Sequence, residues 1–159
     1  MPKSRSGYKY ESTYLDAIFD HPARTINRIV AIIRKEFPKC NGVVVGDGIS
    51  GVSMIAPVAL KLKVPFAIAR SKRTHSPLKV EGHTDVKRYV FIDDCIDSGK
   101  TFRSVYKKMY GWNKSKPIGA VLFYSQDERL RYCTEYKKFR VSGVVVDLKI
   151  IRTYGRWPT

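Results

Sequence analysis

Residues 89 to 101 read Tyr-Val-Phe-Ile-Asp-Asp-Cys-Ile-Asp-Ser-Gly-Lys-Thr. The stretch begins with four apolar residues, which predict a buried parallel β-strand. Asp93 and Asp94 follow at once, at the carboxyl end of that strand, where open α/β sheets bind their ligands. The turn from Asp97 to Thr101 can open a helix, and the exposed N–H groups of such a turn favour a phosphate. The pattern predicts a sugar-phosphate site, with the acids for hydroxyl groups and the turn for the phosphate.

The same letters also suit a strand followed by an ordinary capped helix. Asp97 or Ser98 would then serve as the N-cap of that helix. A bare cap does not need two preceding carboxylates, so the ligand-binding interpretation is favoured.

The rest of the chain alternates between predicted helices and strands. The expected helices span residues 11–19, 22–37, 52–62 and 101–110, and the expected strands span residues 43–45, 66–69, 89–92, 118–124 and 144–148. This alternation predicts an α/β fold with a central, mostly parallel sheet flanked by helices. Residues 71–87 have little apolar pattern, and a loop of this length is usually functional or disordered.

The composition indicates a single globular domain, residues 1–159, that is 43% hydrophobic. No apolar run approaches the roughly 18 residues of a membrane span. The amino terminus is basic but lacks an apolar region, so we expect no secretory signal. The three cysteines, Cys40, Cys95 and Cys133, are scattered and form no metal-binding pair. This usage predicts reduced thiols and a cytoplasmic location.

The charge of the chain is strongly positive. Thirty Lys and Arg against 14 Asp and Glu give a net charge of +16. Nucleic acid is an obvious partner for such a surface. The alternative is a basic surface, exposed to solvent, that has no specific partner.

Residues 89–101 resemble the phosphoribosyl-diphosphate (PRPP) motif of type I phosphoribosyltransferases at all 13 positions, with Phe91 and Cys95 as mild departures. Residues 96–101 are most similar to the hypoxanthine-guanine and xanthine-guanine branch. The resemblance implies the type I fold, with a flexible lid loop at residues 71–87 and a small hood built from residues 126–159. It also implies transfer of a phosphoribosyl group to a nucleobase with release of diphosphate. Mg²⁺ would be the cofactor, and the chain would form a homo-oligomer.

The resemblance also assigns roles to the residues of the motif. Asp93 and Asp94 would bind the ribose hydroxyls, directly or through Mg²⁺, and Asp97 would act as the catalytic residue near N7 of a purine. The implied PRPP-binding set is Asp93, Asp94, Asp97, Ser98, Gly99, Lys100 and Thr101. Because orotate and adenine enzymes usually have Ala at the position of Asp97, a 6-oxopurine is the expected acceptor.

A second loop, Gly46-Asp47-Gly48-Ile49-Ser50-Gly51, lies between a predicted strand and a predicted helix. Its glycines let the backbone approach a ligand closely. By resemblance, Gly46, Asp47 and Gly48 belong to the diphosphate loop, and Arg70 and Lys72 would neutralise the leaving group. The alternative is a Gly-rich turn beside a basic loop, neither of which has a ligand.

The part of the motif that would recognise the base departs from the family. The purine branch carries a Lys after the fourth strand, where this chain has Phe123-Tyr124-Ser125-Gln126. Tyr154 and Trp157 are instead the candidates for stacking on a base, although Trp157 also suits simple packing of the C-terminus. A second function therefore stays open: a regulatory or nucleic-acid-binding protein of the same fold, with weak or no catalysis.

Overall fold

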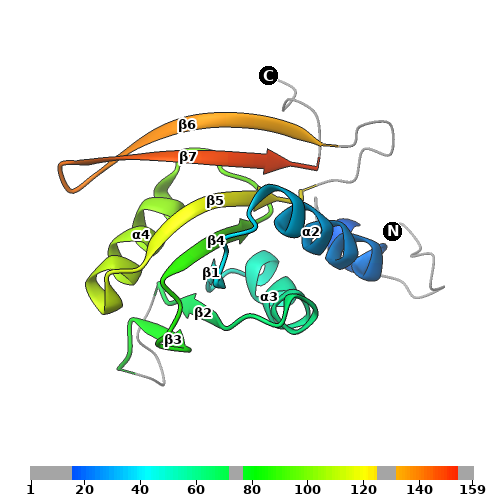
Figure 1. The fold of residues 1–159 in the computed structure, drawn as a ribbon, viewed down its shortest axis with the longest axis horizontal. Helices are drawn as coiled ribbons and strands as arrows, with labels where there is room; N and C mark the ends of the chain where they lie inside the picture. Colours follow the sequence, from blue (N-terminus) through cyan, green and yellow to red (C-terminus); the bar gives the residue numbers. More distant parts are fainter. Residues whose placement is uncertain (1–15, 72–76, 125–131, 154–159) are drawn as a thin grey trace.

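The computed structural model describes residues 16–71, 77–124 and 132–153, which form one α/β unit (Figure 1). Its helices are α1 (Asp16–Phe19), α2 (Pro22–Glu36), α3 (Ile49–Leu62) and α4 (Lys100–Asn113). Its strands are β1 (Gly42–Gly46), β2 (Phe66–Ala69), β3 (Val80–Gly82), β4 (Arg88–Asp93), β5 (Lys116–Leu122), β6 (Cys133–Val141) and β7 (Val144–Arg152).

All the strands of the described residues join one sheet in the order β3-β2-β1-β4-β5-β7-β6. Neighbours from β2 to β7 are parallel, whereas β3 and β6 pair antiparallel at the two edges. The prediction of a mostly parallel sheet flanked by helices is therefore confirmed. None of the helices in the described ranges is long and apolar enough to cross a membrane.

The sheet is covered on both faces, with α4 on one side and α1, α2 and α3 on the other (Figure 1). The alternation along β4 serves both layers. Phe91 packs toward α4 against Phe102, whereas Val90 and Ile92 face the layer that contains Ile29 of α2. Burial on both faces explains why β4 reads as a continuous apolar run, and this double support fixes the end of the strand where Asp93 stands.

The segment predicted as one long loop, residues 71–87, contains a strand. β3 pairs with β2 through Ala67–Gly82, Ile68–Glu81 and Ala69–Val80. Three residues of strand, of which only Val80 is buried, leave too short a pattern to recognise from sequence. Residues 72–76 of the expected lid lie outside the described residues, and closure of the lid over the site stays a prediction.

Residues 133–152, within the segment expected to form the hood, form the long hairpin of β6 and β7. β7 pairs in parallel with β5 through Ala120–Ile150, so the hairpin extends the central sheet. β6 was missed because its outward-facing residues are polar and its inward-facing residues include Glu135 and Lys137. A role of this hairpin in covering a base stays a prediction.

Candidate functional site

A cavity of about 760 Å³ opens at the carboxyl ends of β1, β2 and β4. β1 leads to β2 on one side, whereas β4 leads to β5 on the other, so their loops leave the sheet in opposite directions. Such a switch in strand order is where open α/β sheets bind ligands. The walls are the loop at residues 46–51, the loop at residues 93–99 and one face of α4.

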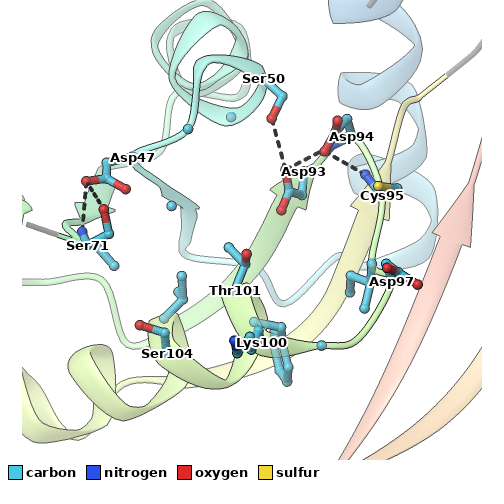
Figure 2. A pocket seen from close by; sticks show the side chains of 18 of the residues that line it. Asp47, Ser50, Ser71, Asp93, Asp94, Cys95, Asp97, Lys100, Thr101 and Ser104 are labelled. Atoms are coloured by element: carbon cyan, nitrogen blue, oxygen red, sulfur yellow. Dashed lines mark hydrogen bonds between the residues drawn. The ribbon is translucent and has the colours of Figure 1, made fainter. Parts of the chain in front are cut away.

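The carboxylates of Asp93 and Asp94 lie at one end of this cavity (Figure 2). Asp93 Oδ1 accepts hydrogen bonds from Ser50 Oγ at 3.1 Å and from the Asp94 N–H at 2.9 Å. Asp94 Oδ1 accepts one from the Cys95 N–H at 2.9 Å. Ser50 comes from the loop after β1, so this contact joins the two loops that form the site. Both acids that the sequence singled out therefore lie on the wall of the cavity.

The surroundings of Asp93 shift the pKa of its carboxyl group upward. Burial and the neighbouring Asp94 raise the pKa of Asp93 to about 7. A cation or hydroxyl donors placed beside the pair would favour its ionised form. Burial and Asp94 also raise the pKa of the Cys95 thiol to about 11, so this thiol stays protonated near neutral pH and is a poor nucleophile.

The turn at residues 97–101 lies at the start of α4, as predicted, and its residues line the cavity. Gly99 is the N-cap, with a left-handed φ of 78°. The turn is braced from behind by Arg103, which donates from Nη1 to the Ser98 carbonyl at 2.7 Å and from Nε to the Arg140 carbonyl at 3.2 Å. The hairpin strand β6 therefore helps to hold the loop whose N–H groups favour a phosphate.

The loop after β1 forms the opposite wall of the cavity. Gly46, Asp47 and Gly48, which the resemblance assigns to a diphosphate loop, all line it, and their contact with diphosphate stays a prediction. Asp47 Oδ2 accepts hydrogen bonds from the Ser71 N–H at 2.8 Å and from Ser71 Oγ at 2.9 Å (Figure 2). Burial alone would raise the pKa of Asp47, but the bonds from Ser71 and the charge of Lys108 leave it below its usual value.

The structure does not bring Arg70 into the cavity. Its Nη1 lies 2.9 Å from Glu81 Oε1 on β3, and Arg70 is not among the lining residues. The strand β3, which the sequence did not predict, supplies this partner and draws the guanidinium to the sheet edge. Lys72, Tyr154 and Trp157 lie outside the described residues, so their expected contacts with diphosphate or base stay predictions.

Several residues that sequence reasoning missed also line the cavity. Ser50 and Ser71 contribute hydroxyls from two loops, and Ser104 and Lys108 come from α4. Ser104 and Lys108 lie three and seven positions after Thr101, so all three residues share one helical face. This spacing could have identified them from the sequence. A helix that starts at a phosphate-binding turn presents one face to the ligand, and residues three and seven positions along lie on that face.

The family model described as PRTase-CE matches residues 9–149. The chain belongs to the PRTase-CE family. A search among curated protein sequences found no match to it.

Solved structures show which fold this PRTase-CE chain adopts. Orotate phosphoribosyltransferase from Francisella tularensis is 23% identical with a TM-score of 0.52, and the match covers 63% of this chain and 50% of that one. The orotate enzyme from Aeropyrum pernix is 16% identical with a TM-score of 0.54, over 76% and 70% of the two chains. The adenine enzyme from Rhodothermus marinus is 15% identical with a TM-score of 0.52, over 76% and 80%.

These matches confirm the type I phosphoribosyltransferase fold. The chain spans half the length of the Francisella enzyme. The hypoxanthine-guanine branch suggested by residues 96–101 is not confirmed by them, since they are orotate and adenine enzymes.

The donor set of the PRTase-CE pocket fits Mg²⁺. Asp93 and Asp94 offer adjacent carboxylate oxygens, which are the ligands that this cation prefers. The described residues contain no cluster of three or more His, Cys, Asp or Glu that would hold an ion alone. Mg²⁺ is commonly bound by one or two carboxylates together with substrate oxygens and water, so Asp93 and Asp94 would hold it jointly with a bound substrate.

Proposed function

We propose that the protein is a phosphoribosyltransferase that moves the phosphoribosyl group of PRPP to a nucleobase and releases diphosphate. The observation that carries the proposal is that one cavity brings together the Asp93–Asp94 pair, the turn at residues 97–101 and the loop at residues 46–51. The pair and the turn belong to one continuous motif, whereas Ser50 of the loop lies 43 positions before Asp93. Each element nevertheless lines the same cavity with the chemistry that one part of PRPP requires.

In this proposal, each wall of the cavity binds a different part of PRPP. The N–H groups of the turn at residues 97–101 hold the 5′-phosphate at the start of α4. Asp93 and Asp94 accept from the ribose hydroxyls, directly or through Mg²⁺. Gly46 and Gly48 allow the backbone to approach the diphosphate. Mg²⁺, when bound, neutralises part of the diphosphate charge. The chain thereby fixes the sugar between two anchored ends, which positions C1 for attack.

The acceptor that we propose is a 6-oxopurine. Asp97 supports this, since it is exposed and lines the same cavity as the acid pair. By the resemblance stated above, its carboxylate would accept or share the N7 proton as the base attacks C1. A positioned general base of this kind contributes about 10²–10⁴-fold to a rate.

Diphosphate release from PRPP with Mg²⁺ should be measured across a panel of purines and pyrimidines. We expect the fastest release with 6-oxopurines, and Asp97→Asn should lower kcat about 10²-fold or more. The pair Asp93→Asn and Asp94→Asn should weaken PRPP binding at least tenfold, whereas Asp85→Asn, at an exposed carboxylate outside the cavity lining, should not. Absence of turnover with every base would overturn the nucleobase assignment. Unchanged PRPP affinity in the double variant would overturn the site.

One observation favours a second candidate, a nucleic-acid-binding protein with weak or no catalysis. Tyr136, Lys138 and Arg140 alternate along β6 and therefore share one exposed face. Tyr136 is 76% exposed, which is unusual for a large aromatic side chain. An aromatic ring beside cations on one face is an arrangement in which the ring stacks on single-stranded bases while the cations contact phosphates.

A further inference from the structure

The charged side chains are unevenly distributed in the cavity, with carboxylates gathered at one end and a mixture of acid and base at the other. Asp93, Asp94 and Asp97 lie at the carboxyl end of β4, where a sugar is expected. The other wall of the cavity includes Asp47 and Ser71, together with Ser104 and Lys108 from α4. A diphosphate that leaves a sugar carries several negative charges, so its end of the site requires cations or N–H donors.

Two cations were expected for this task, of which Lys72 lies outside the described residues and Arg70 is engaged elsewhere. Arg70 pairs with Glu81 at 2.9 Å and does not line the cavity. The loop after β1 adds a negative charge, Asp47, beside the expected diphosphate. Among the described lining residues, Lys100 and Lys108 are the basic ones, and Lys100 belongs to the turn proposed to hold the 5′-phosphate.

Lys108 has the geometry of a site residue. It is half-buried on α4, two turns beyond Thr101 and on the same helical face. Its Nζ donates to Ser104 Oγ at 2.9 Å, which orients the ammonium and leaves two N–H bonds for other acceptors. Within the described ranges, no carboxylate lies in ion-pair contact with it, although its charge acts on Asp47 across the cavity.

We propose that Lys108 binds the diphosphate of PRPP, in the role expected of Arg70. Ser104 positions its ammonium, and Ser71 lines the same part of the cavity. This inference rests on the proposed function, because it assigns a residue to one half of that substrate. It places the leaving-group cation on the helix that begins at the 5′-phosphate turn, so one rigid element binds both ends of PRPP.

The test compares Lys108→Met with Lys107→Met, which removes the same charge from the neighbouring, exposed position of α4. Binding of inorganic diphosphate and of ribose 5-phosphate, each with Mg²⁺, should be measured by calorimetry. We expect Lys108→Met to weaken diphosphate binding at least tenfold and to leave ribose 5-phosphate binding within twofold. Lys107→Met should change neither, and Lys108→Arg should recover part of the diphosphate affinity.

The outcomes separate this inference from the function on which it rests. Equal diphosphate affinity in Lys108→Met and Lys107→Met, with wild-type binding intact, would overturn the role of Lys108 alone. Parallel loss of both ligands in Lys108→Met would also overturn it, because it would show a general structural role. Failure of the wild-type protein to bind PRPP, diphosphate or ribose 5-phosphate would overturn the proposed function itself.

Discussion

Gly99 is the residue on which the shape of the phosphate turn depends most directly. Its φ of 78° lies in the left-handed region, and a Cβ there would sit 2.8 Å from Phe139 Cε1 and 2.9 Å from Arg103 Nη1. Gly99→Ala therefore adds steric pressure to the backbone cost of about 1–2 kcal/mol for a left-handed residue. We expect a lower Tm and at least tenfold weaker binding of ribose 5-phosphate, measured by thermal unfolding and calorimetry.

Gly143 offers a matched control for this substitution. Its φ is 79°, almost the same, but a Cβ added there would have no heavy atom within 4 Å. Gly143→Ala thus carries the backbone cost without the clash, and it lies in the turn between β6 and β7, away from the cavity. Equal Tm losses in the two variants, or unchanged binding in Gly99→Ala, would contradict the role of close packing behind the turn.

At the residue scale, sequence reasoning located the groups that belong to one continuous motif. Asp93 and Asp94 line the cavity because their place is set locally, by the strand that ends beside them. Arg70 and Lys108 show the opposite case, since their surroundings depend on distant segments. Whether Arg70 faces a ligand was decided by Glu81 on β3, and no local pattern contains that information.

At the element scale, the carboxylate of Glu36 links α2 to the hairpin and to Tyr132 just before it. Glu36, the last residue of α2, accepts hydrogen bonds from Tyr132 and, at 2.7 Å, from Lys149 Nζ of β7. Bonds from Lys149 and Tyr132 hold the pKa of Glu36 below its ordinary value of 4.5. The anion therefore stabilises the folded state fully above that ordinary value, and the contribution is lost as the pH falls through the lower, folded-state pKa.

We expect Glu36→Gln to lower the Tm at pH 7, with a difference from wild type that shrinks as the pH drops below about 4.5. Thermal unfolding followed by circular dichroism from pH 7 to pH 3 measures this. Asp85→Asn is the control, because it removes an exposed carboxylate for which no hydrogen bond is recorded in the described part of the chain. A Tm difference for Glu36→Gln that is constant over the whole pH range would contradict the assignment.

Elements with two buried faces were predictable, and edge elements were not. β1 and β4 carry continuous apolar runs because helices cover both of their faces. β6 has no such run, because it is an edge strand that pairs with β7 and one of its faces is exposed to solvent. A strand is recognised in a sequence by its buried apolar residues. A half-exposed edge strand rich in Lys and Arg has few of them, so it resembles an irregular C-terminal segment.

At the scale of the whole molecule, the chain has a net charge of +16, and we expect the exposed face of β6 to be one place where this charge binds a partner. On β6, Lys138 lies 3.7 Å from Asp147, but both side chains are more than 70% exposed, and a pair in water contributes little. Lys138 and Arg140 therefore remain available for phosphates on the same exposed face as the ring of Tyr136. This arrangement predicts binding of single-stranded RNA that weakens as salt increases.

The prediction compares two variants with equal loss of charge. Lys138→Ala with Arg140→Ala removes two cations from the β6 face, and Lys39→Ala with Lys107→Ala removes two exposed cations from other surfaces. Fluorescence anisotropy with a single-stranded oligonucleotide should show a larger loss for the β6 variant, and Tyr136→Ala should weaken binding without changing the salt slope. Charge alone would predict equal losses in both double variants, because each releases the same number of counterions. Only a stacking surface makes a neutral substitution at Tyr136 costly, so this variant decides between a general positive field and a specific face.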